Sequence, residues 1–338
     1  MANEGAVYKV KQRRYVMILM TGIALSLFVF CFSLCFGNYQ TSVSDVVQAV
    51  RKPHQNQQIY NIIFLSRLPR LIGAVFVGAA LSAAGLVYQE LFSNRMASPD
   101  ILGVSAGASV GASISIYLGF SFSLTSLFAF LGGIIAVSLT IMISGLFSKE
   151  GPVSLILAGI VVGGLMNSLL GLFKYLSNDA QLSTITFWLM GGFYNTNYRQ
   201  LSVACPVICA GLILLFMMRW KIVMLRNGNA DATIHGINAK MVRQVCVAVT
   251  TVITSVSICV SGTIGWIGLA IPNLMRLLVQ NDGRKLLPLS LVYGSLFTEL
   301  CDLLARSVTN TEIPVGIISG FLGAVMFVSV LAIQMKRE

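Results

Sequence analysis

The sequence predicts an all-α, polytopic membrane protein, and three observations lead to this prediction. Hydrophobic residues make up 56% of the chain and charged residues only 10%, with a mean hydropathy of +0.82. Soluble domains carry about 25% charged residues, so this composition argues against an ordinary soluble domain. The apolar segments are long and continuous, which favours membrane helices over the alternating strands of a barrel.

About ten apolar segments are long enough to cross a membrane. A span needs roughly 20 residues, because a helix rises ~1.5 Å per residue through a hydrocarbon layer ~30 Å thick. A shorter segment, 182–193, is expected to form a half-helix at one surface. The predicted spans are 15–36, 68–91, 102–120, 124–147, 152–175, 201–219, 242–261, 264–279, 286–304 and 313–335.

The chain is expected to be a single transmembrane domain over 1–338, with an N-terminal tail over 1–14. The first span has an apolar core of about 22 residues, whereas cleaved signals have roughly 7–15, and no small-x-small site follows it. We therefore expect the first span to stay in the mature protein.

Lysine and arginine predict that both termini are cytoplasmic. With the N-terminus inside, sixteen of these residues fall on the inner side and seven on the outer side, as the positive-inside rule requires. The net charge of +11 then reflects topology, and no nucleic-acid partner is expected. The seven outer residues are Arg51, Lys52, Arg67, Arg70, Lys174, Arg199 and Arg306.

The sequence gives no sign of an energy source in this chain. It has no G-x-x-x-x-G-K-[ST] motif, the usual loop that binds nucleotide phosphates. Charged residues such as Glu90, Glu299 and Asp302 fall near predicted helix ends, whereas an ion-coupled carrier keeps them within the membrane. We expect a non-catalytic transport subunit without a cofactor. An ion-coupled carrier and a membrane receptor or scaffold are the alternatives.

Small residues predict close helix packing rather than metal binding. Gly103, Gly107 and Gly111 recur every four residues, and glycine lets helix backbones approach each other in lipid. Cysteine pairs at i,i+4 spacing could in principle bind metal, but they lie in plain apolar helices without histidine or carboxylate neighbours. We interpret them as packing residues and expect no metal site.

Six ordered motifs resemble the permeases of binding-protein-dependent ABC importers. They are RLPR at 67–70 with the GAVFVGAALSAAGLVYQ that follows, NRMASPDILGVSAGASVGA, WLMGGF at 188–193, GTIGWIGLAIPNLMRLL at 262–278, DLLAR at 302–306 and EIPVGIISGFLGA at 312–324. They are similar to the subfamily for iron-siderophore, haem and vitamin B12, from about residue 60 to the C-terminus. The resemblance implies the ten-helix type II importer permease fold in a bacterial plasma membrane.

The resemblance also implies partners and a cargo. The expected partners are a second permease subunit, two ATPase subunits, an extracytoplasmic solute-binding protein and membrane lipid. ATP and magnesium would be bound by the ATPase. The expected cargo is a ferric siderophore, with haem or cobalamin as alternatives, because selectivity in this family lies largely in the binding protein.

Three arginines are the candidates for docking the binding protein. Arg67 and Arg70 are three residues apart, on one helical face at the outer mouth of the second span, and Arg306 is at the outer end of the ninth. In the family that the chain resembles, arginines at these positions meet glutamates on the binding protein. Exposed pairs contribute only about 0–1 kcal/mol each, so we expect them to orient the partner. Anchoring at lipid headgroups is the alternative.

The loop 219–243 resembles the coupling element that sits in a cleft on the ATPase. Asn229 and Asn238 are expected to cap two short helices, and Gly236 to end the first of them. The family pattern is Gly-x-x-x-Ala-x-x-Leu-Gly, in which His235 replaces the leucine here. An ordinary cytoplasmic loop is the alternative. The predicted coupling residues are Arg226, Gly228, Ala232, His235 and Gly236.

The turn 92–100, between the second and third spans, resembles the turn that forms part of the cytoplasmic gate in vitamin B12 permeases, and the resemblance implies the same role here. Irregular backbone at membrane depth is tolerated only where protein or a water-filled path surrounds it. The family usually has Asn-Pro-Leu-Ala-x-Pro, and here Arg95 and Met96 replace the first proline and the leucine. A plain tight turn is the alternative. The gate candidates are Asn94 and Met96, with a second constriction at Pro152, Val153 and Ser154.

The fifth predicted span carries Asn167 and Ser168 near mid-membrane. The resemblance implies that this helix lines the path at the subunit interface. A buried hydrogen bond from Asn167 to another helix would explain it equally well. The eighth-span motif departs from the family, because it reads Pro272-Asn273 where Pro-His is usual, so no histidine-based role is carried over.

Overall fold

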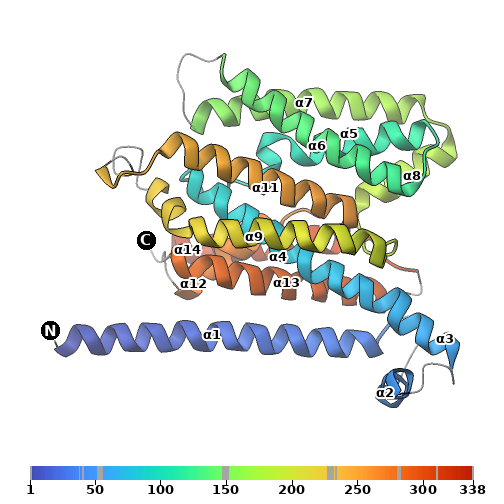
Figure 1. Cartoon of the computed structure of the whole chain (residues 1–338), viewed down its shortest axis with the longest axis horizontal. Helices are drawn as coiled ribbons and strands as arrows, with labels where there is room; N and C mark the ends of the chain where they lie inside the picture. The colour runs from blue at the N-terminus through green and yellow to red at the C-terminus, as the bar shows by residue number, and fades with distance from the viewer. Residues whose placement is uncertain are drawn as a thin grey trace.

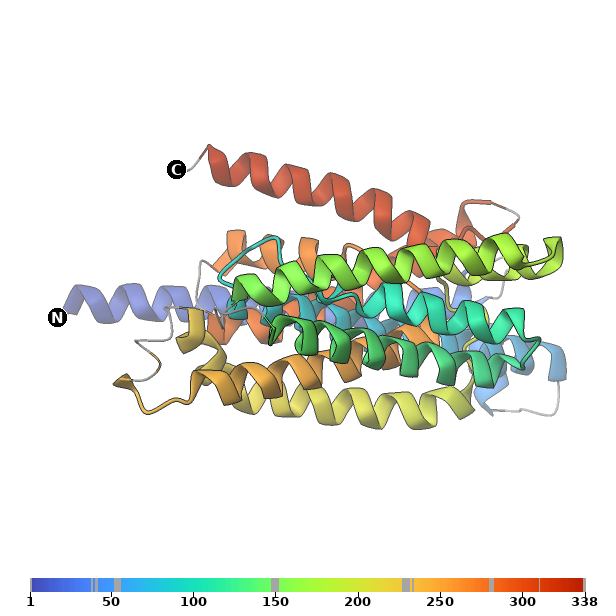
Figure 2. The ribbon, with the colours of Figure 1, turned by 90° about the horizontal axis from the view of Figure 1, so that it is seen from above.

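The computed structural model describes residues 2–37, 39, 42–51, 56–146, 152–226, 232, 234–279, 283–309 and 311–336. These residues form helices joined by turns, and none of them lies in a strand. The helix α1 begins and α14 ends at the same end of the bundle (Figures 1 and 2). We call this the terminal end and the opposite one the distal end.

The helices cross the bundle in alternating directions (Figure 1). Their bounds are α1 Ala2–Cys35, α2 Val43–Arg51, α3 Gln57–Tyr60, the π-helical η1 Asn61–Arg67, α4 Leu68–Leu91, the 3-10 turn η2 Pro99–Leu102, α5 Val104–Tyr117, α6 Phe122–Ser144, α7 Pro152–Leu176, α8 Asp179–Met190, α9 Tyr198–Arg226, α11 Ala239–Ser261, α12 Ile267–Val279, α13 Gly283–Ser307 and α14 Val315–Met335.

Each of the ten predicted spans contains a helix, and the all-α membrane fold is confirmed. Eight helical segments among the described residues are long and apolar enough to cross a membrane, and α5 and α12 are shorter apolar helices. The predicted third span, 102–120, is shortened because Gly103 has a left-handed φ of 82° after η2. Whether both short helices cross the membrane remains a prediction. The predicted half-helix is α8.

Two boundaries differ from the prediction at the terminal end. The tail 1–14 is helical from Ala2 and continuous with the first span. The predicted sixth span, 201–219, continues as α9 to Arg226, because the residues after 219 still form apolar helical turns. The start of the predicted loop 219–243 is therefore helix.

The helix α4 lies at the centre of the bundle, and nearly all of its side chains are buried. It packs against α9, α11, α12 and α13. Its glycines permit this approach, because a Cβ on Gly78 would collide with the carbonyl of Gly294, and one on Gly85 with the carbonyl of Gly268. The predicted close packing is confirmed at Gly107 and Gly111 of α5, where an added Cβ would collide with backbone carbonyls of α6, but not at Gly103. Figure 2 shows α14 on one side of the bundle and α9 on the other.

Candidate gate and coupling site

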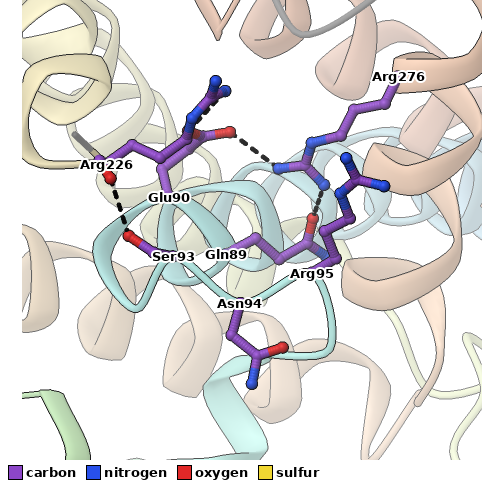
Figure 3. A pocket seen from close by; sticks show the side chains of 7 residues that line it. All are labelled: Gln89, Glu90, Ser93, Asn94, Arg95, Arg226 and Arg276. Atoms are coloured by element: carbon purple, nitrogen blue, oxygen red, sulfur yellow. Dashed lines mark hydrogen bonds and ion pairs between the residues drawn. The ribbon is translucent and has the colours of Figure 1, made fainter. Parts of the chain in front are cut away.

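Helices from three parts of the chain meet around Glu90 at the terminal end. Glu90 is in the last turn of α4, Arg226 ends α9, and Arg276 is on α12. The side chains of Arg226 and Arg276 approach Glu90 from opposite sides (Figure 3). The cavity between them has a volume of about 290 Å³ and is lined by Gln89, Glu90, Ser93, Asn94, Arg95, Arg226 and Arg276.

Glu90 and Arg276 form a buried ion pair. The distance between Arg276 Nη2 and Glu90 Oε1 is 2.8 Å, and both side chains are almost fully buried. Arg276 also donates to Gln89 Oε1 and, at 3.3 Å, to Asn273 Oδ1. A buried charge requires such partners, and removing one partner of a buried pair typically costs about 3–5 kcal/mol. The pair therefore fixes α4 to α12.

Arg226 connects the end of α9 to the same carboxylate. Its Nη1 lies 3.7 Å from Glu90 Oε2, and its carbonyl accepts a hydrogen bond of 3.1 Å from Ser93 Oγ. A cation in the last turn of a helix is also favoured by the helix dipole. Arg226 was predicted as a coupling residue, and the structure places it between the coupling loop and the turn after α4.

The turn after α4 is held by hydrogen bonds on both sides. Ser93 has a left-handed φ of 47°, and the Asn94 amide donates to Gln89 O at 3.1 Å. The Asn94 side chain accepts from the Met96 amide at 2.9 Å, so Asn94 fixes the shape of the turn. From α12, Asn273 Nδ2 donates to Arg95 O at 2.9 Å. The turn is thus fixed by hydrogen bonds within itself and from α12.

The two gate candidates of this turn differ in their surroundings. The Asn94 side chain accepts a hydrogen bond within the turn, whereas the Met96 side chain is 58% exposed. Asn273 was noted in the sequence only as a departure from the family motif, yet it is fully buried and supports the turn. A gating role for Asn94 and Met96 is untested by this geometry.

The second predicted constriction lies where α6 ends and α7 begins. Ser144 Oγ donates to Ser154 Oγ at 2.9 Å, which ties the two helices together, and Ser154 is buried. Val153 is exposed, and α7 begins at Pro152, whose side chain lies outside the described part. Further along, Gly159 packs on the carbonyl of Ile101, so α7 contacts η2 after the gate turn.

The polar pair in α7 faces away from the chain's own core. Asn167 and Ser168 are both exposed, and the Ser168 hydroxyl donates to Gly164 O at 3.0 Å within the helix. A buried hydrogen bond from Asn167 to another helix of this chain was the alternative, and it is wrong. The prediction that this face lines a path between subunits is untested.

The predicted coupling loop is anchored by one residue, whereas His235 and Gly236 next to it are exposed. Ala232 is fully buried and its carbonyl accepts from the Ile237 amide at 2.9 Å, with Gly236 at a left-handed φ of 70°. Ile234, which the sequence did not single out, is 80% exposed. Asn238 caps a helix through the Met241 amide, but this helix is α11 itself and not the second short helix that was predicted. Gly228 and Asn229 lie outside the described residues.

The three docking candidates gather at the distal end, but they are not exposed. Arg67, Arg70 and Arg306 are only 4–6% exposed. Arg70 pairs with Asp302 at 2.6 Å and with Glu312 at 2.7 Å, and Arg306 pairs with Asp302 at 3.1 Å. The expectation of exposed arginines at the outer mouth is therefore wrong. Buried Asp302, which the sequence did not assign, explains why two of them turn inward.

Two of these arginines, Arg67 and Arg306, hold the end of α1. Arg67 donates to the carbonyls of Leu34, at 2.6 Å, and Tyr39. Arg306 donates to the carbonyl of Phe36 at 3.2 Å and to Ser33. The last carbonyls of a helix have no intrahelical partner, and these guanidinium groups supply one. Simple anchoring at lipid headgroups is also wrong for side chains that are enclosed in this way.

Comparisons with known proteins agree with this architecture. The FecCD transport family matches residues 23–333. The chain is 34% identical to the molybdate import system permease protein MolB of Haemophilus influenzae, over 90% of this chain and 92% of that protein. It is 36% identical to a probable iron chelatin transport system permease protein of Helicobacter pylori, over 80% of this chain and 82% of that protein.

A solved structure is also similar over almost the whole chain. It is an inward-facing conformation of a putative metal-chelate type ABC transporter. The TM-score is 0.85 at 30% sequence identity, and the match covers 94% of this chain and 99% of the other.

Proposed function

The chain belongs to the FecCD transport family and is an ABC importer permease, and from this premise we propose that it imports a chelated metal, with a ferric siderophore as the first candidate. The observation that carries this proposal is the likeness over 94% of the chain to a transporter described as metal-chelate type. The relative named for iron chelatin supports the same cargo. Haem and cobalamin remain as alternatives within the class of metal chelates.

Molybdate is a second candidate cargo. The relative named for molybdate import is 34% identical over 90% of this chain. Molybdate is a small oxyanion and a siderophore complex is much larger, so the two cargoes would need different binding proteins. The path proposed along α7 offers Asn167 and Ser168 and no charged side chain at that depth. Such a path suits several cargoes, which leaves selection to the binding protein.

We propose that the terminal end faces the cytoplasm of a bacterial cell and contacts two ATPase subunits. In this arrangement both termini are cytoplasmic, and ATP and magnesium are held by the partner. The exposed Ile234 and His235 would lie in the ATPase cleft, with Ala232 anchoring the loop. A second permease subunit, either a copy or a paralogue, would cover the polar face of α7.

The network around Glu90 would transmit the movement of the ATPase to the gate. Displacement of the coupling loop pulls on the end of α9, where Arg226 is bound both to Glu90 and, through its carbonyl, to Ser93. Ser93 lies in the gate turn, and Glu90 is fixed to α12 through Arg276. Movement of the end of α9 would therefore be transmitted directly to the turn that contains Met96.

At the distal end, the arginine cluster would shape the docking surface for the binding protein. Arg70 holds Glu312, whose side chain is partly exposed. Arg67 and Arg306 hold the segment after α1. In this proposal the arginines position the elements that the partner touches, and they do not themselves reach into the solvent.

Co-purification tests the assignment of partners. A tagged copy is purified from native membranes in mild detergent, and the accompanying chains are identified by mass spectrometry. An ATPase with a Walker motif, together with a binding protein, is the expected result. The ligand retained by that binding protein then distinguishes a ferric siderophore, haem or cobalamin from molybdate. A chain that always purifies alone would contradict the proposal.

A further inference from the structure

A groove lies between α6, α9 and α11 near the distal end. Its volume is about 780 Å³, which is within the usual range for small-molecule sites. The helix α11 packs against both α6 and α9 and so forms the floor. The lining residues are Ser123, Ser126, Leu127, Phe130, Asn197, Arg199, Gln200, Val203, Ala204, Val207, Val256, Cys259 and Val260.

The groove is polar at its mouth and apolar along its length. Asn197, Arg199 and Gln200 lie at the start of α9, and Ser123 lies in the first turn of α6. From Asn197 to Val207 the helix advances roughly 15 Å, at ~1.5 Å per residue. This is about half of a ~30 Å hydrocarbon core. The groove therefore has the depth of one lipid leaflet.

The polar mouth has donors and a positive charge. Arg199 is exposed, and no acidic side chain in the described part of the chain pairs with it. Gln200 Nε2 is buried and has no hydrogen-bond partner among the described residues. The start of α9 adds the partial positive charge of a helix N-terminus. A negatively charged group is the complement of this mouth.

The floor of the groove is held in place by hydrogen bonds between helices. Ser126 Oγ donates to the carbonyl of Cys259 at 3.2 Å, and Cys259 Sγ donates to the carbonyl of Ser126 at 2.9 Å. These bonds use the polar atoms of both side chains, so the deeper groove presents mainly apolar surface. Val203 and Leu127 are exposed at its edges. An acyl chain is the natural occupant of such a surface in a membrane.

We propose that this groove binds one phospholipid with an anionic headgroup, from the leaflet at the distal end. Its phosphate would contact Arg199 and Gln200, and one acyl chain would lie along α9 and α11. The proposal rests on the membrane-spanning fold and not on the proposed cargo. Cations near a membrane surface attract anionic lipid, and each one changes the affinity a few-fold.

Native mass spectrometry of the full chain tests this proposal. The protein is released from mild detergent with equal amounts of phosphatidylglycerol and phosphatidylcholine of identical acyl chains. We expect the phosphatidylglycerol adduct to be favoured, and Arg199→Ala to weaken it roughly three- to ten-fold. The matched control is Arg51→Ala, which removes another exposed arginine, at the end of α2.

A second variant tests the acyl-chain part of the groove. Val203→Trp places a large side chain at an exposed position of the lining, where folding is little affected because the residue is 64% exposed. It should weaken the binding of both lipids. Equal binding by Arg199→Ala and Arg51→Ala, or undiminished binding by Val203→Trp, would overturn the proposal. So would a second copy of the chain that covers the groove and excludes lipid. Transport is not measured here, so this outcome is independent of the proposed function.

Discussion

Glu90 and Arg276 are 186 residues apart in sequence, yet their charged groups lie 2.8 Å apart inside the protein. The pair joins the central helix α4 to α12 directly beside the turn predicted to be a gate. Arg226 reaches the other oxygen of the same carboxylate from α9. One buried carboxylate therefore links the end of α4, α12 and the helix that leads into the predicted coupling loop.

Glu90→Gln should destabilise the protein, because it leaves the Arg276 guanidinium buried without its counter-ion. Loss of one partner of a buried pair costs about 3–5 kcal/mol. The double variant Glu90→Gln with Arg276→Met removes both charges and should be less destabilised than the single one. Thermal unfolding in detergent measures the stability of the single and the double variant. If the single variant unfolds at the wild-type temperature, Glu90 does not hold these helices together.

Arg226→Ala should leave the fold intact and weaken coupling. Its ion pair is long, at 3.7 Å, and its side chain is 31% exposed, so we expect a loss of stability of only about 0–1 kcal/mol. ATP hydrolysis by the assembled transporter should continue, with less cargo imported per ATP. Lys221→Ala, an exposed position earlier in α9, is the control. Equal ratios of cargo to ATP in the two variants would argue against a coupling role.

Arg70→Ala should lower the stability of the fold as well as any binding of the partner. It leaves the buried Asp302 with Arg306 alone, and we expect a loss of about 3–5 kcal/mol. Glu312→Gln alters the partly exposed end of the same network and should cost about 0–1 kcal/mol. Folded yield and thermal unfolding are the measurements. A stable Arg70→Ala that has lost only affinity for the binding protein would restore the docking role first predicted.

Gly85→Val should prevent correct packing of α4 on α12. A side chain at this position meets the backbone of Gly268, which cannot move aside as a flexible side chain could. Overpacking typically costs about 1–3 kcal/mol, and a clash with backbone should reach or exceed the upper figure. Gly171→Ala on α7 is the control, because no described atom outside the adjacent residues and the backbone of its own helix lies within 4 Å of the added Cβ. Similar yields of folded protein would show that α4 tolerates greater separation from α12.

The sequence predicted the fold well because its main signals are local. Apolar length located ten helices, and glycine spacing indicated close packing, which Gly107 and Gly111 show between α5 and α6. The starts of α5 and α12 were less accurate, since the left-handed φ at Gly103 and Trp266 depends on tertiary contacts.

The site was predicted less completely because it depends on contacts distant in sequence. Glu90 appeared in the sequence only as a charge near a helix end, and nothing local indicated that Arg276 would face it. The arginines of the distal end were located correctly but expected to be exposed. Their burial follows from the end of α1, whose carbonyls they bind, and from Asp302 on α13. The acidic Asp302, four residues before Arg306 in the DLLAR motif, was the signal in the sequence that could have indicated this burial.

Reconstituted uptake tests the central claim most directly. The chain is assembled with its co-purified ATPase in proteoliposomes, and uptake of cargo delivered by the binding protein is followed with and without ATP. We predict uptake that requires ATP and the binding protein and is lost when the ATPase is omitted. Uptake by this chain alone, driven by a proton or sodium gradient, would contradict the assignment.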